Sequence, residues 1–195
     1  EFSIEIKPEV STIIGKQGGS LVLPDGNSDD GECKIEVIRN TLDRNVKFRL
    51  KELNRKKLPV HQDKTLVYSV RPVAGYEIST DKLQHFENFI VIKLLYLDLD
   101  QDGKEDISGV DENTLKIWWY DEDTKLWRYI GGQVDRRNNT ITAKIHHLSI
   151  FAIFPTKIVD GDMFRPKERI VFLPAQGGVK NIKGVVFSGI SNANV

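Results

Sequence analysis

Apolar and polar residues alternate along much of this chain, and this alternation is the strongest constraint on its fold. It runs through CKIEV at residues 33–37, KFRL at 47–50 and LVYSV at 66–70. Because successive side chains of a strand point to opposite faces, the pattern gives each strand one apolar face. Pro, Gly, Asn and Asp separate the runs, as turns require. Helical periodicity is weak almost everywhere, so the sequence predicts an all-β fold.

The second half of the chain shows how closely the expected strands follow one another. Apolar runs at residues 115–120, 126–130, 140–145 and 149–154 are separated by short polar turns and by no helical pattern. Strands at this spacing are typical of antiparallel sandwiches. We therefore expect an antiparallel β-sandwich, in which these four strands follow each other as a meander.

The composition of the sequence changes after residue 155. We expect residues 1–155 to form the β-sandwich domain and residues 156–167, which are polar and contain Pro and Gly, to form a linker. Residues 168–195 hold two apolar runs, which predict a short two-strand C-terminal appendage. Two strands cannot bury a core alone. The tail therefore packs on the sandwich, begins a further module, or pairs with another chain.

Composition and motifs exclude several function classes. The chain carries 28 basic and 28 acidic residues with no basic cluster, so we expect no nucleic-acid partner. Its longest apolar run, residues 89–97, is interrupted by Lys93 and is too short to span a membrane. The single cysteine, Cys33, cannot form an intrachain disulfide. We find no phosphate-binding loop, no nucleophile elbow and no zinc motif, since His61 and His85 lack partners at ligand spacing. We therefore expect no enzyme.

The stretch DLDQDGKED at residues 98–106 carries the most specific chemical signal. Asp98, Asp100 and Asp102 alternate, Gly103 follows and Asp106 closes the cluster. These residues match positions one, three, five, six and nine of an EF-hand-type calcium loop. Ca²⁺ takes six to eight hard oxygen ligands, and alternate residues of a tight loop can direct their carboxylates inward. The sequence therefore predicts a Ca²⁺ site.

The remaining ligands of this predicted site are less regular. The Lys104 carbonyl would serve at position seven, whereas position twelve, where a bidentate glutamate is expected, is Gly109. Asp111 or Glu112 would substitute for that ligand. We expect modest affinity and a structural role in a long loop between strands. The alternative is a solvated acidic turn without an ion.

Four further motifs resemble a known family. They are GGSLVLPDG at residues 18–26, LKIWWYD at 115–121, KLW at 125–127 and HLSIFA at 147–152. In this order they resemble the β-sandwich domain of ankyrins and netrin receptors, in the form common in bacterial surface proteins. FRPKERI at 164–170 and VFSG at 186–189 resemble the opening of an immunoglobulin-like module, similar to that of flagellar hook-capping proteins. The resemblance implies an extracellular or cell-surface bacterial protein.

The same resemblance suggests autoproteolysis as an alternative. Related domains sometimes cut themselves at a His-x-Ser triplet, here His147, Leu148 and Ser149. His147 would act as general base and Ser149 as nucleophile on the Leu148 carbonyl, giving an ester that water hydrolyses. The other interpretation, which we favour, is that both residues are ordinary sandwich residues.

Aromatic residues on the runs at 115–120 and 126–130 raise a third possibility. Rings exposed on a strand pair can stack on sugars, and an exposed Trp118 would indicate a carbohydrate-binding module. The alternative is that Trp119 and Trp127 anchor the core, because a sandwich needs large residues between its sheets.

Together these features predict a non-enzymatic structural or adhesive module of a secreted or cell-surface bacterial protein. We expect one Ca²⁺ in the Asp98–Asp106 loop. Expected partners are other surface or matrix proteins, or neighbouring domains of the same polypeptide. A glycan is a further possible partner, and residues 165–195 would support homo-oligomers by donating strands to a neighbouring copy.

Overall fold

The computed structural model describes residues 8–23, 31–61, 71–81, 85–156, 170–171 and 182–183. The chain divides into two compact units, Glu1–Thr156 and Lys157–Val195. Within the described residues every regular element is a strand, apart from two short 3₁₀ turns. The all-β prediction is confirmed. Among these residues no helix is long and apolar enough to cross a membrane.

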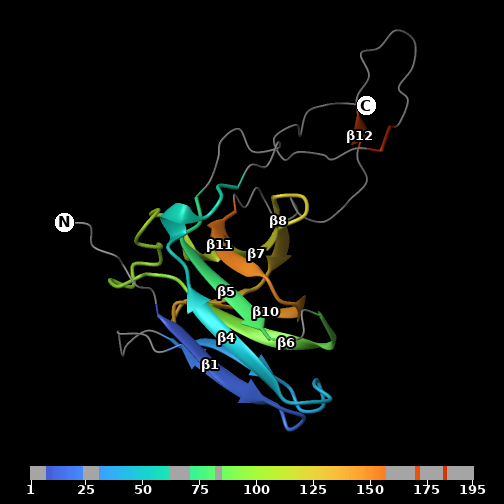
Figure 1. Cartoon of the computed structure of the whole chain (residues 1–195). Helices are drawn as coiled ribbons and strands as arrows, with labels where there is room; N and C mark the ends of the chain where they lie inside the picture. Colours follow the sequence, from blue (N-terminus) through green and yellow to red (C-terminus); the bar gives the residue numbers. More distant parts are fainter. Residues whose placement is uncertain are drawn as a thin grey trace, which may run out of the picture. The chain divides into compact units, whose positions relative to one another are not determined.

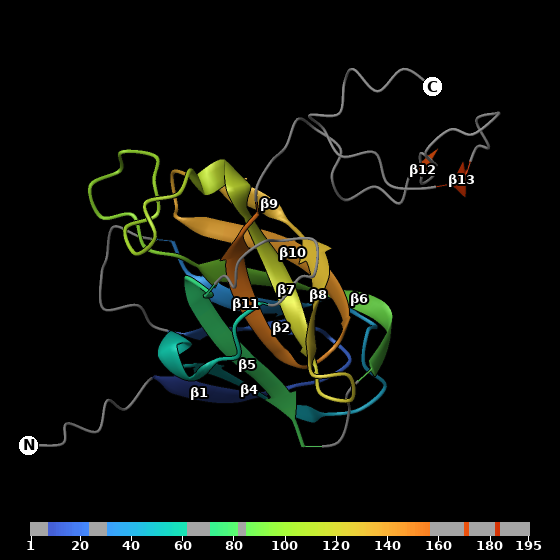
Figure 2. The same cartoon turned by 90° about the horizontal axis from the view of Figure 1, so that it is seen from above.

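The first unit is a sandwich of two antiparallel sheets (Figures 1 and 2). The six-stranded sheet has the order β1 (Glu9–Ile14), β4 (Val46–Glu52), β5 (Ala74–Thr80), β11 (Ile150–Pro155), β7 (Leu115–Asp121) and β8 (Leu126–Gly131). The five-stranded sheet has the order β2 (Gly19–Leu23), β3 (Cys33–Val37), β6 (His85–Leu95), β10 (Thr140–His147) and β9 (Gln133–Asp135).

The alternating pattern of the sequence fills the space between the sheets. In β4, Val46, Phe48 and Leu50 are fully buried, and the residues between them are more exposed. β6 and β10 of the other sheet contribute Ile90, Ile92 and Ile141 in the same way. Burying each such side chain contributes about 1.5–3 kcal/mol. These side chains form the main core.

The outer face of the six-stranded sheet carries a smaller apolar cluster. Because side chains of a strand alternate, Ile117 enters the main core while Trp118 points to the opposite face. There Trp118 packs with Trp127, Phe154 and Leu58, which follows the 3₁₀ turn η1 (Arg55–Lys57). The Trp127 indole N–H donates to the Pro59 carbonyl at 3.0 Å. The segment before residue 61 therefore covers part of this face.

The expected meander is wrong in one respect. The four runs of the second half do form strands, but β7, β8 and β11 belong to one sheet and β10 belongs to the other. The three-residue strand β9, which the sequence analysis did not anticipate, starts the change of sheet and pairs with β10. Crossing between sheets is what allows both faces of the core to be closed.

Several predicted segments lie outside the described residues. These are the alternating run at residues 66–70 and most of the predicted linker and tail. In the second unit β12 (Ile170–Val171) pairs antiparallel with β13 (Ile182–Lys183). The linker boundary and strand donation by residues 165–195 remain predictions.

Candidate metal centre

The aspartate loop connects the two sheets. It leaves β6 of the five-stranded sheet after Leu95 and reaches β7 of the six-stranded sheet through the 3₁₀ turn η2 (Glu112–Thr114). The Tyr96 side chain is buried at the start of the loop. The backbone N–H of Tyr96 donates to the Asn139 carbonyl at 3.0 Å. The loop therefore begins inside the molecule, and Asp98 two residues later is also buried.

Backbone hydrogen bonds fold the loop back on itself. The Asp106 N–H donates to the Leu97 carbonyl at 2.8 Å, and the Glu112 N–H donates to the Gly103 carbonyl at 3.2 Å. Gly103 has a φ of 85°, a conformation that glycine adopts without strain. This is the sharp turn that the spacing of the aspartates predicts, and it turns the chain back toward Asp98.

Three of the predicted ligands come together. One carboxylate oxygen from each of Asp98, Asp100 and Asp106 lies within 4.8 Å of the others. Loop N–H groups orient them: Gly103 donates to Asp98 Oδ2 at 3.3 Å, and Leu99 donates to Asp106 Oδ2 at 2.9 Å. Three negative charges this close repel one another unless a cation or protons join them.

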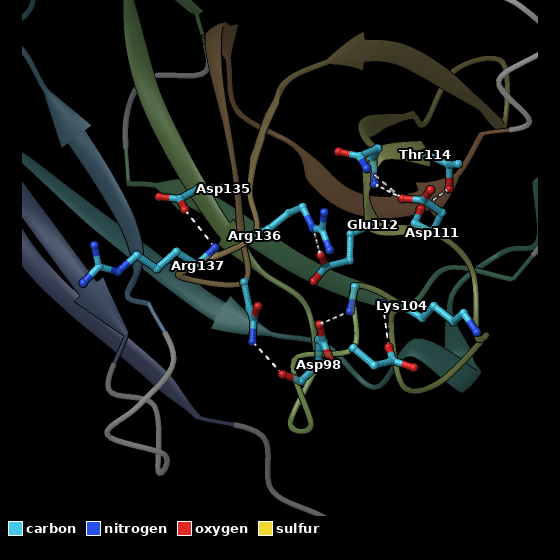
Figure 3. A network of polar contacts seen from close by, with 12 residues as sticks. Asp98, Lys104, Asp111, Glu112, Thr114, Asp135, Arg136 and Arg137 are labelled. Atoms are coloured by element: carbon cyan, nitrogen blue, oxygen red, sulfur yellow. Dashed lines mark hydrogen bonds and ion pairs between the residues drawn. The ribbon is translucent and has the colours of Figure 1, made fainter.

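Of these three aspartates, Asp98 has a buried carboxylate oxygen without a hydrogen-bond donor. Its side chain is only 1% exposed, and its Oδ1 atom has no hydrogen-bond partner (Figure 3). Burial, and then the neighbouring Glu112 carboxyl, raise the pKa of Asp98 above its usual value. A buried acceptor left unsatisfied costs about 1–3 kcal/mol, and more when it is charged. The Asp98 carboxylate therefore lacks a positive partner.

Glu112 and Arg136 form an ion pair next to Asp98. Glu112 is 1% exposed, and its Oε2 accepts from Arg136 Nε at 2.7 Å (Figure 3). Its Oε1 is buried without a hydrogen-bond partner. Two buried carboxyls, Asp98 and Glu112, thus lie near one guanidinium, which can compensate only one of the two negative charges when both groups are ionised. Sequence analysis missed Arg136, because it lies in the β9–β10 turn, far along the chain.

The other predicted ligands lie elsewhere in the loop. Asp102 Oδ1 accepts from the Lys104 N–H at 2.7 Å, so this carboxylate closes a local turn. Lys104 forms an isolated bridge with Asp111. The Asp111 carboxylate caps η2 by accepting from the Asn113 N–H at 2.9 Å. Neither Asp102 nor Asp111 belongs to the group of carboxylates formed by Asp98, Asp100 and Asp106, and the Lys104 carbonyl as a ligand remains a prediction.

His147 and Ser149 line one cavity near the ends of β10 and β11. The Ser149 hydroxyl donates to the Tyr120 carbonyl at 2.8 Å. The imidazole of His147 packs edge-on against Trp119, with ring centres 4.3 Å apart. Its Nε2 atom is buried and has no hydrogen-bond partner. The Ser149 hydroxyl is thus hydrogen-bonded to a backbone carbonyl. Cleavage after Leu148 remains a prediction.

Trp119 packs against the main core as the sequence predicted, whereas Trp127 lies on the outer face of the six-stranded sheet and not between the sheets. Trp118 and Trp127 are each 5% exposed and form the outer apolar cluster, and Trp119 packs against the main core. The exposed Trp118 that carbohydrate stacking required is therefore absent, because the strand turns this ring toward Phe154 and Leu58. Tyr129 beside it is 41% exposed.

Comparison with family models and with curated proteins finds no match for this chain. The fold that the family resemblance implied is confirmed as a two-sheet sandwich. The site itself fits a hard cation, because its donors are carboxylate oxygens and one of them is buried without a partner.

Proposed function

We propose that this chain is a non-catalytic structural β-sandwich module whose aspartate loop binds Ca²⁺. The observation that carries the proposal is Asp98, a buried carboxylate with one oxygen that no protein donor reaches. A divalent cation supplies the missing charge and draws Asp100 and Asp106 to the same point. The ion would be held by Asp98, Asp100 and Asp106. Glu112, next to Asp98, would add negative charge without being a ligand.

Oxygen-only ligands favour calcium over borderline metals. Thiolates and imidazoles select zinc or copper, and the three gathered ligand groups are carboxylates alone. Mg²⁺ requires near-ideal octahedral geometry, whereas Ca²⁺ accepts irregular loops and bidentate carboxylates. A loop in which Asp102 and Asp111 are engaged with backbone N–H groups is irregular in this sense.

The position of the loop explains why an ion would matter to the fold. Because the loop joins β6 of one sheet to β7 of the other, an ion there ties the two sheets together at one edge of the core. The expected affinity is modest, about 10⁻⁴–10⁻³ M, as in extracellular calcium modules. The family resemblance supports a role at a bacterial cell surface, as a spacer or adhesive unit between neighbouring domains or proteins.

Titration calorimetry with Ca²⁺ on the full chain tests the proposal. We expect one ion per chain and loss of binding in Asp98→Asn, which keeps the size of the side chain and removes its charge. Asp121→Asn is the matched control, because Asp121 lies in a second acidic turn and should leave binding unchanged. Absence of calcium heat in the unmodified protein, or equal affinity in Asp98→Asn, would overturn the proposal.

A further inference from the structure

A second group of metal-binding side chains lies at the opposite end of β6. His85 is the first residue of this strand, whereas the aspartate loop follows its last residue, Leu95. The register places His85 directly across from His147, near the end of β10. Nothing in the spacing along the chain indicates this pair, because the two histidines meet only through the antiparallel pairing of distant strands.

The local geometry places the two rings beside each other. The β6–β10 register shifts between Ile145 and His147, as at a β-bulge. Bulges re-aim side chains at strand ends and beside functional sites. Directly opposed residues have Cβ atoms about 4.5–5.5 Å apart, and the two imidazole centres lie 6.1 Å apart. The rings are therefore near neighbours on one face of the sheet.

His147 has a ring nitrogen that the protein leaves unsatisfied. Its Nε2 atom is buried without a hydrogen-bond partner, and the ring is held edge-on by Trp119. A buried polar atom without a partner costs about 1–3 kcal/mol. Burial, followed by the charges of His85 and His146, also lowers the pKa of His147. Burial disfavours the charged imidazolium, and neutral imidazole is the form that binds metals.

The cavity around the pair favours cations. It measures about 670 Å³ and includes both histidines in its lining. Four carboxylates line the same cavity, and none of the described residues in its lining is a lysine or arginine. The carboxylates are those of Glu77, Glu122, Asp123 and Asp121, of which Asp121 is already paired with Arg128. Clefts lined by one sign of charge concentrate ions of the opposite sign.

We infer that His85 and His147 form a second metal site, which takes a borderline first-row ion such as Zn²⁺. With a Zn–N bond of about 2.0–2.1 Å and the ring centre about 1.2 Å beyond the nitrogen, two imidazoles on one tetrahedral ion have centres about 5 Å apart. The observed 6.1 Å is longer than this, and rotation of the exposed His85 side chain would close the difference. Imidazole nitrogen suits zinc, copper and nickel, whereas the aspartate loop offers only oxygen.

The pair would leave part of the coordination sphere open. Among the described residues no third carboxylate, cysteine or histidine lies close enough to complete a set of three with these histidines. Water, or a ligand that enters the cavity, would fill the remaining positions. Sites with an open position are those that can bind or polarise a further molecule. The inference does not depend on the calcium site.

Calorimetric titration of the full chain with Zn²⁺, in excess Ca²⁺ so that the aspartate loop is saturated, tests the inference. We expect one zinc ion per chain and weaker binding in His85→Ala, whose side chain is exposed and not needed for folding. Loss of an outer-shell partner costs about 10–100-fold in metal affinity, so loss of a ligand should cost at least that. His146→Ala is the matched control, because this exposed neighbour contacts Phe89 instead. Asp98→Asn should bind zinc as the unmodified protein does.

Nitrogen NMR of the imidazoles gives a second readout without any substitution. Zinc should shift the ring nitrogens of His85 and His147 and leave those of His146 and His61 unchanged. Unchanged zinc affinity in His85→Ala, or shifts confined to His146, would overturn the inference.

Discussion

Two acidic turns among the described residues differ in what balances their charge. In the turn after β7, Asp121 accepts hydrogen bonds from the Thr124 N–H at 3.2 Å and from Arg128 Nε at 3.1 Å. The contacts with Thr124, then those with Arg128, lower the pKa of Asp121 to about 2. In the aspartate loop, burial raises the pKa of Asp98, and its Oδ1 has no partner.

This difference teaches that acidic density alone does not identify a metal site. The turn DED at residues 121–123 is acidic at all three positions, whereas five of the nine residues at 98–106 are acidic. Thr124 and Arg128 already satisfy the Asp121 carboxylate, so binding of an ion there would add little stabilisation. Asp98 is the reverse case, since its charge is buried and short of a partner. What distinguishes the two regions is the unsatisfied oxygen, which only the folded structure reveals.

The largest effect should come from removing the arginine behind the aspartate loop. Arg136→Met leaves the buried Glu112 carboxylate without its 2.7 Å partner, which should cost about 1–3 kcal/mol of unfolding free energy. Arg128→Met removes the equivalent contact of the exposed turn and should cost less than about 1 kcal/mol, because surface ion pairs contribute little. Urea denaturation of both variants measures the difference.

Equal losses of unfolding free energy in the two arginine variants would show that the buried Glu112 carboxylate depends on its arginine no more than the exposed Asp121 does. Adding Glu112→Gln to Arg136→Met should then sharpen the comparison, since it also removes the carboxylate that lost its partner. We expect the double variant to recover part of the lost stability.

Neutralising one aspartate in each turn should have opposite effects when calcium is absent. In a chelator, Asp98→Asn should be at least as stable as the unmodified protein, because an amide replaces a poorly compensated buried carboxylate. Asp121→Asn should be less stable, because Arg128 and Thr124 lose their charged acceptor. Melting temperatures in EDTA measure both, and a destabilised Asp98→Asn would contradict the account.

The smallest effect concerns acid pH. The folded pKa of Asp121 is about 2, below its usual value of 3.8, so its stabilisation is complete above about pH 4. It is lost as pH falls through the folded pKa. The stability difference between the unmodified protein and Asp121→Asn should therefore shrink between pH 4 and pH 2. A difference that stays constant over this range would mean that the Asp121 charge is not responsible.

The sequence predicts the elements of this fold better than their arrangement. Alternation in β3 and β4 indicates strands, because one face of each is buried. It does not indicate which sheet a strand joins, and β10 lies in the sheet opposite to β11. That choice depends on contacts between distant residues, as does the short strand β9.

The candidate site shows the same division. Alternating aspartates and Gly103 predict the loop and its sharp turn, because these depend on neighbours in the chain. Burial of Asp98 and the support from Arg136 depend on how the β9–β10 turn packs, which no local pattern encodes. The pairing of His85 with His147 is likewise a product of strand register.

Thermal unfolding with and without calcium tests most directly whether an ion braces the sandwich at Asp98. At a Ca²⁺ concentration about 100 times the dissociation constant, binding stabilises the folded state by about 2.7 kcal/mol, which raises the melting temperature of a domain this size by about 5–10 °C. We expect that rise in the unmodified protein, its reversal by EDTA and its absence in Asp98→Asn. Identical melting curves of the unmodified protein in Ca²⁺ and in EDTA would contradict the account.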